Sequence, residues 1–125
     1  MKLYQVIDFP TVFAKIKNQK LPFKTSYQLT MLAREIEKHH AYYQEQFQSL
    51  LLEYSVKDEN GNPKFTEDGQ GILLVEETTD EAYSKLEELR GLDIELPEFK
   101  FSIDSFGDIE LSPEEMAVLI PFIQD

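Results

Sequence analysis

Residues 25–54 read TSYQLTMLAREIEKHHAYYQEQFQSLLLEY and carry the strongest structural signal in the chain. This stretch contains neither glycine nor proline. Apolar side chains recur there at every seventh position and in a second stripe beside it: Leu29, Ile36, Tyr43 and Leu50, then Leu32, Phe47 and Tyr54. This spacing predicts one long amphipathic helix over residues 26–54, about 43 Å long at a rise of 1.5 Å per residue.

The sequence also indicates where this helix begins and what its apolar seam packs against. Thr25 and Gln28 have the T-x-x-Q spacing of a capping box, which predicts a helix start at this point. The seam spans four heptads, the lower limit for a coiled coil, but three polar residues occupy its second position: His39, Gln46 and Glu53. We therefore expect the helix to pack on the rest of the chain. Self-association through it, giving a homo-oligomer, is the alternative.

Three shorter helices are predicted, over residues 9–19, over residues 79–90 and from residue 113 onward. Their expected N-caps are Asp8, Thr78 and Ser112. Glu81 and Glu115 follow the second and third of these caps at capping-box spacing. Gly91 is a natural left-handed residue after the second helix, and Pro121 limits the third to two or three turns.

The remaining segments suggest a small antiparallel sheet from residues 1–7, 55–75 and 94–104. Asn60-Gly61 is a strong signal for a two-residue hairpin turn. Phe99, Phe101 and Ile103 alternate with polar residues, as in a half-buried strand. We therefore expect an α+β fold, with the long helix and two or three short helices packed on a small sheet or hairpin. The 125 residues are expected to form a single domain.

Composition and charge narrow the function classes. Cysteine is absent, which excludes disulfides, thiolate metal sites and cysteine nucleophiles. The net charge is −12, which disfavours direct binding to nucleic-acid phosphates. Residues 1–24 carry a net +4, whereas residues 58–125 carry four basic and 19 acidic side chains, a net of −15. The acidic half is either a solvated surface or one presented to a basic partner.

No motif for enzyme chemistry or for a cofactor is recognisable. His39 and His40 are the two imidazoles, and adjacent helical residues point about 100° apart, so they cannot share a metal. Glu35 and His39 could supply two ligands but lack a third His or Cys. The spacing Asp58-x-Asn60-x-Asn62 matches the opening of a calcium loop, but the match then fails, because Pro63 stands at the sixth position, where glycine is needed. We expect a non-enzymatic protein with no metal and no cofactor.

The apolar runs are short. The longest are residues 50–52, 72–75 and 117–122, far below the roughly 18–20 residues of a membrane-spanning helix. The N-terminus lacks the long apolar core of a secretory signal. We therefore expect a soluble protein in the host-cell cytoplasm with no membrane partner.

The order of these features resembles a family of small acidic proteins of unknown function encoded by phages and prophages of low-GC Gram-positive bacteria. The resembling segments, in chain order, are LPFKTS at 21–26, EY at 53–54, KDENGN at 57–62, LEEL at 86–89 and GDIELSPEEM at 107–116. The resemblance implies a phage or prophage origin. It implies no activity and no site residues.

We therefore expect an accessory protein that acts by protein–protein contact, in virion assembly or a related role, with a phage structural protein or a host protein as partner. The expected contact residues lie on the long helix and in the acidic half: His40, Tyr42, Glu76, Glu77, Asp80, Glu87 and Glu88. One alternative is an acidic inhibitor of a host defence or nucleic-acid enzyme that mimics nucleic acid. A second is an oligomeric small-molecule or nucleotide binder, for which Arg34 and Arg90 are the available phosphate forks.

Overall fold

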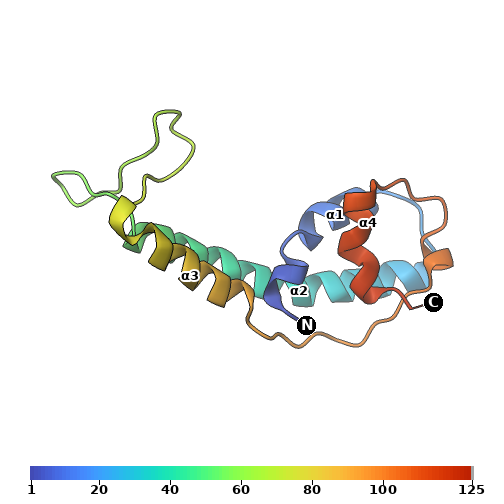
Figure 1. The fold of residues 1–125 in the computed structure, drawn as a ribbon. Helices are drawn as coiled ribbons and strands as arrows, with labels where there is room; N and C mark the ends of the chain where they lie inside the picture. The colour runs from blue at the N-terminus through green and yellow to red at the C-terminus, as the bar shows by residue number, and fades with distance from the viewer. Residues whose placement is uncertain (125) are drawn as a thin grey trace. The chain divides into compact units, whose positions relative to one another are not determined.

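The computed structural model describes residues 1–124 and is mainly helical in that range (Figure 1). Its α-helices are α1 (Phe9–Ile16), α2 (Phe23–Glu53), α3 (Thr79–Arg90) and α4 (Pro113–Leu119). Short 3₁₀ helices lie at η1 (Leu3–Val6), η2 (Glu76–Thr78), η3 (Ile103–Phe106) and η4 (Ile120–Phe122). The predicted long helix and the helix at 79–90 are both present.

The predicted α+β fold is wrong, because residues 1–124 contain no β-strand. The segment expected as a first strand forms η1, and residues 94–104 make only single-residue bridges at their margins, Lys2 with Asp93 and Phe101 with Ile123. The alternation that suggested a strand ends where η3 begins, which leaves Ile103 53% exposed. Alternation without a neighbouring strand to pair with therefore does not make a sheet here.

Residues 55–75 pair in a closed ring instead of a ladder. The Val56 N–H donates to the Leu73 carbonyl (2.8 Å), the Leu73 N–H to the Lys64 carbonyl (2.9 Å), and the Lys64 N–H to the Val56 carbonyl (2.8 Å). The three extended segments, around Val56, Lys64 and Leu73, thus each pair with both of the others. Each pair of segments makes one isolated antiparallel bridge and no continuous ladder. Pro63 is tolerated opposite Lys57 because the N–H groups of the flanking residues, Asp58 and Lys64, make the bonds of this bridge.

The turn predicted at Asn60-Gly61 is longer than two residues. The Gly61 N–H donates to the Asp58 carbonyl (3.1 Å) and the Asp58 N–H to the Asn62 carbonyl (2.8 Å), which makes a three-residue loop. Gly61 has φ +80°, the left-handed conformation that such a loop requires. Asp58 Oδ1 accepts the N–H groups of Asn60 and Asn62 (both 2.9 Å), so this carboxylate holds the turn.

Four predicted features of the helix ends differ from the structure. Helix α2 starts at Phe23, so Thr25 lies inside it with 6% exposure and forms no capping box; Ser26 already bonds to the Pro22 carbonyl at 3.0 Å. Helix α1 ends at Ile16, earlier than predicted. Gly91 follows α3 with φ −85°, which is not left-handed, and Thr78 is at the N-cap without capping through its side chain.

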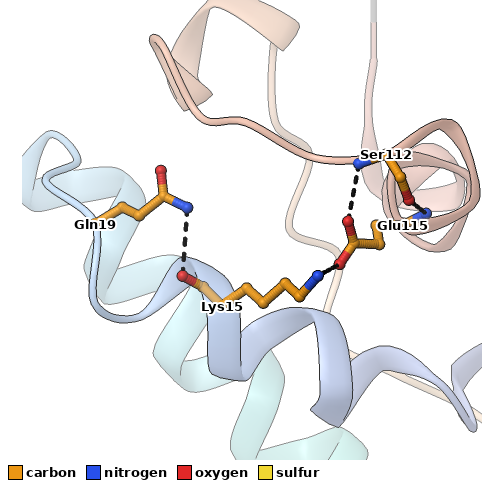
Figure 2. Close-up of polar contacts among 4 residues, drawn as sticks. All are labelled: Lys15, Gln19, Ser112 and Glu115. Carbon is orange, nitrogen blue, oxygen red and sulfur yellow. Dashed lines mark hydrogen bonds and ion pairs between the residues drawn. The ribbon is translucent and has the colours of Figure 1, made fainter.

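The capping box at Ser112 is confirmed (Figure 2). Ser112 Oγ accepts the Glu115 N–H at 3.2 Å, and Glu115 Oε1 accepts the Ser112 N–H at 2.8 Å. The other carboxylate oxygen of Glu115 forms an ion pair with Lys15 of α1, whose carbonyl accepts a bond from Gln19. The Lys15 side chain lowers the pKa of the Glu115 carboxyl, and the Ser112 N–H adds to the effect. The capping box thus fixes the start of α4, and the same carboxylate links α4 to α1 through Lys15.

The described chain packs as two compact units. The first comprises Met1–Ala41 and residues 93–124, and the second comprises Tyr42–Leu92, so α2 contributes residues 23–41 to one and 42–53 to the other. The large side chains with less than 2% exposure all lie in the first unit: Leu3, Val6, Phe9, Ile16, Leu29, Leu32, Ile36, Phe101 and Leu119. Phe9 anchors this core, with its ring edge-on to Phe122 at 5.8 Å.

The second unit has a thinner core. Tyr54, Ser55 and Ala82 are its buried residues, and Tyr43 stacks on Phe47 with ring centroids 5.8 Å apart, although neither ring is buried. The heptad seam of the long helix is therefore deeply buried at Leu29 and Ile36 and only half-buried beyond residue 41.

Candidate interaction surface

The acidic contact residues predicted from the sequence lie on η2 and α3, and all of them are exposed. We call this set the acidic face: Glu76, Glu77, Asp80, Glu87 and Glu88. At 100° per residue, the three members in α3 fall within an arc of about 100°. Ala82 is buried on the opposite side of α3. The amphipathic pattern of α3 therefore turns these carboxylates outward.

The charged residues at the two ends of α3 have the signs that stabilise a helix. Asp80 and Glu81 lie in its first turn, next to the positive end of the helix dipole, and Arg90 lies in its last turn. The Thr79 hydroxyl donates to the Val75 carbonyl at 3.0 Å, which ties this end to the preceding segment. The position of the acidic face therefore follows from local sequence.

No carboxylate of the acidic face forms an ion pair within residues 1–124. The neighbouring cation, Lys85, is directed elsewhere: its Nζ lies 3.8 Å from a Glu53 carboxylate oxygen and 5.5 Å from the centre of the Tyr54 ring. The bond to Tyr54 and the charge of Glu53 raise the pKa of Lys85, while burial raises the pKa of the Tyr54 hydroxyl. Lys85 therefore does not neutralise the charge of the acidic face.

A hollow of about 350 Å³ in the same unit brings Tyr42 and Glu88 together. Tyr42 is 49% exposed. The other lining residues are Gln46, Ser49, Leu50 and Glu53 of α2, Lys85 and Leu89 of α3, and Leu92. Sequence reasoning missed Gln46, Leu50 and Leu89 as parts of this site. The recurrence of Tyr42, Gln46 and Leu50 at four-residue spacing is the signal that places them on one helix side.

His40 lies in the first unit and does not share this hollow with Tyr42. It lines a separate hollow between α1 and α2. His39 is half-buried, and its Nε2 is 3.3 Å from the Glu95 carbonyl oxygen, so it links α2 to the extended segment after α3. Glu35 pairs with Lys38 at 3.0 Å. Across residues 1–124, no three His, Cys, Asp or Glu side chains are grouped as a metal site would require.

Arg34 and Arg90 belong to different units. Arg34 lines the hollow that contains His40, whereas Arg90 ends α3. Each would therefore have to hold an anion together with other partners.

Comparison of the chain with protein-family models, with curated proteins and with solved structures found no match. The phage-family resemblance therefore stays a prediction from the ordered sequence features. In the part of the chain that the structure describes, no helix is both long enough and apolar enough to cross a bilayer.

Proposed function

We propose that this chain is a phage- or prophage-encoded accessory protein without enzymatic activity that acts by binding another protein. The proposed contact surface is the acidic face together with the adjoining hollow at Tyr42. The observation that carries the proposal is a set of five exposed carboxylates with no ion-pair partner, one of which, Glu88, borders a partly apolar hollow. The phage origin is supported by the order of the sequence motifs alone.

Exposed unpaired charge and an apolar recess have complementary uses in recognition. The carboxylates would speed and orient the approach of a basic surface, because long-range electrostatics acts mainly on association rate and register. The hollow would receive an apolar or aromatic side chain of the partner against Leu50 and Leu89, and such anchors supply most of the binding energy. We infer that the partner presents Lys or Arg side chains around an apolar anchor.

The test is affinity capture with three forms of the tagged protein from phage-infected or prophage-induced host lysate. The first is the unaltered chain, and the second carries Asp80→Asn, Glu87→Gln and Glu88→Gln. The third is a matched control with the same charge change at exposed positions of the first unit, Glu98→Gln, Asp108→Asn and Glu110→Gln. Captured proteins are identified by mass spectrometry, and binding is then measured with the purified partner.

A partner retained by the unaltered chain and the control, but lost with the acidic-face variant, supports the proposal. Equal capture by all three forms refutes this surface as the contact. A phage tail or capsid protein indicates an assembly role. A host nuclease or defence enzyme displaced by duplex DNA and released by about 0.5 M salt indicates the alternative, a nucleic-acid mimic, because exposed charges are strongly screened at that ionic strength.

A further inference from the structure

The hollow between α1 and α2 has a different chemistry from the acidic face. It measures about 390 Å³ and lies entirely within the first unit. Helix α1 contributes Phe9, Pro10, Phe13 and Ala14, and α2 contributes Thr30, Ala33, Arg34, Glu37 and His40, with Lys17 following α1. One wall is thus largely apolar, and the charged side chains all come from one end of α1 and one side of α2.

The apolar wall is held in place by the core. Phe9 is 1% exposed, packs against Phe122 and stacks on Phe13 with ring centroids 6.0 Å apart. Ala14 of α1 and Ala33 of α2 also line the hollow, and their small side chains occupy little of its space. A recess with a fixed aromatic wall loses little entropy when a ligand enters it.

The rim carries cations without partners in a chain of net charge −12. Neither Arg34 nor Lys17 forms an ion pair within the described residues 1–124. Lys15, by contrast, is already paired with Glu115. Glu37 is the one carboxylate among the lining residues, so the rim has a net charge of +1 with His40 neutral. This excess suits a singly charged anion better than a doubly charged one.

From this we infer that the hollow binds a small amphipathic carboxylate, with its apolar body against Pro10, Phe13 and Ala33 and its carboxylate at Arg34 and Lys17. The guanidinium of Arg34 offers the planar pair of N–H donors that a carboxylate accepts. A volume of 390 Å³ equals that of about 13 water molecules, so the hollow has room for a ligand of roughly a dozen non-hydrogen atoms. The site uses no carboxylate of the acidic face and is independent of the proposed function.

The test is a titration of the ¹⁵N-labelled full chain with sodium decanoate, followed by NMR chemical shifts, with 1-decanol and sodium acetate as comparison ligands. Decanoate is expected to shift the amides around residues 9–17 and 30–40 and to bind at least about tenfold more tightly than either comparison ligand. Equal affinity for decanol would overturn the role of the cations. Shifts confined to other residues, or none at millimolar decanoate, would overturn the site.

Two variants locate the contacts. Lys17→Gln with Arg34→Gln should weaken decanoate binding about tenfold, whereas Lys20→Gln with Lys24→Gln, a matched loss of two exposed cations outside the hollow, should leave it unchanged. Ala33→Leu should block binding by filling the space. Its amide spectrum outside the hollow reports whether the fold is kept. Unchanged affinity in the first variant refutes the assignment.

Discussion

The same substitution at two positions of α2 tests how the long helix is buried. Leu32 is 0% exposed in the core of the first unit, whereas Leu50 is half-buried in the second unit. The sequence pattern gives both residues an apolar stripe position on one continuous helix. Leu32→Ala and Leu50→Ala have equal helix propensities before and after the change, so any difference between them reports burial.

The expected magnitudes follow from burial. Truncating a fully buried leucine costs about 3–5 kcal/mol, because transfer free energy and a residual cavity add. Leu50 lines an open hollow, so its loss leaves no closed cavity and is expected to cost about 1 kcal/mol. For a chain of this size each kcal/mol lowers Tm by roughly 4 °C. Leu32→Ala should therefore lose more than about 10 °C and Leu50→Ala less than about 6 °C.

The assay is urea and thermal unfolding followed by far-ultraviolet circular dichroism at several protein concentrations. An equal loss of unfolding free energy in Leu50→Ala and Leu32→Ala would refute the conclusion that Leu50 is less buried than Leu32. It would indicate that the seam is covered along its whole length. A Tm of the unaltered chain that rises with concentration would then identify a second copy as the cover, which is the self-association alternative.

Three further outcomes are expected. Ser112→Ala should lower the free energy of unfolding by about 1 kcal/mol and Ser112→Gly by only a few tenths, in urea titrations, because glycine is tolerated at an N-cap. Gly61→Ala, at φ +80°, should cost about 1 kcal/mol more than Gly71→Ala, which the same titrations measure. The pKa values of Glu115 and Asp93 are lowered in the folded state, so both carboxylates stabilise it at any pH above their ordinary pKa values of 4.5 and 3.8. This contribution is lost as the pH falls through the lowered pKa values. In urea titrations between pH 6 and about pH 2, the free energy of unfolding should therefore fall less in Glu115→Gln than in the unaltered chain.

Local signals in the sequence predicted local structure well. The absence of glycine and proline, together with heptad spacing, placed the long helix to within a few residues, and the bounds of α3 were predicted correctly. The box at Ser112 forms as its spacing indicates, since both of its bonds close within four residues. The prediction at Thr25 was wrong because the helix begins at Phe23. The N–H groups that the Thr25 side chain would cap, two and three residues further on, already bond to carbonyls of the preceding turn.

The prediction of a sheet was wrong because strand pairing depends on residues that are distant in sequence. Phe99 and Phe101 alternate with polar residues as a strand would, but within residues 1–124 the one bridge that Phe101 forms is to Ile123. The exposure of the acidic face could be predicted from the amphipathic spacing of α3. The two hollows could not be predicted from local spacing, because each lies where α2 packs beside another helix. The expectation of one domain for the whole chain stays a prediction.

Salt separates the two proposed sites in one experiment. The acidic face offers solvent-exposed carboxylates, whose attraction to a partner is screened within about 3 Å at 1 M salt. In the hollow of the first unit, Arg34 would act together with the apolar wall at Phe13 and Ala33, where apolar burial contributes as well and is not screened. Partner binding should therefore weaken steeply with added salt, whereas decanoate binding should weaken only by the contribution of its carboxylate. The same steep salt dependence at both sites would mean that the apolar wall contributes nothing, and the hollow would then be only a patch of surface charge.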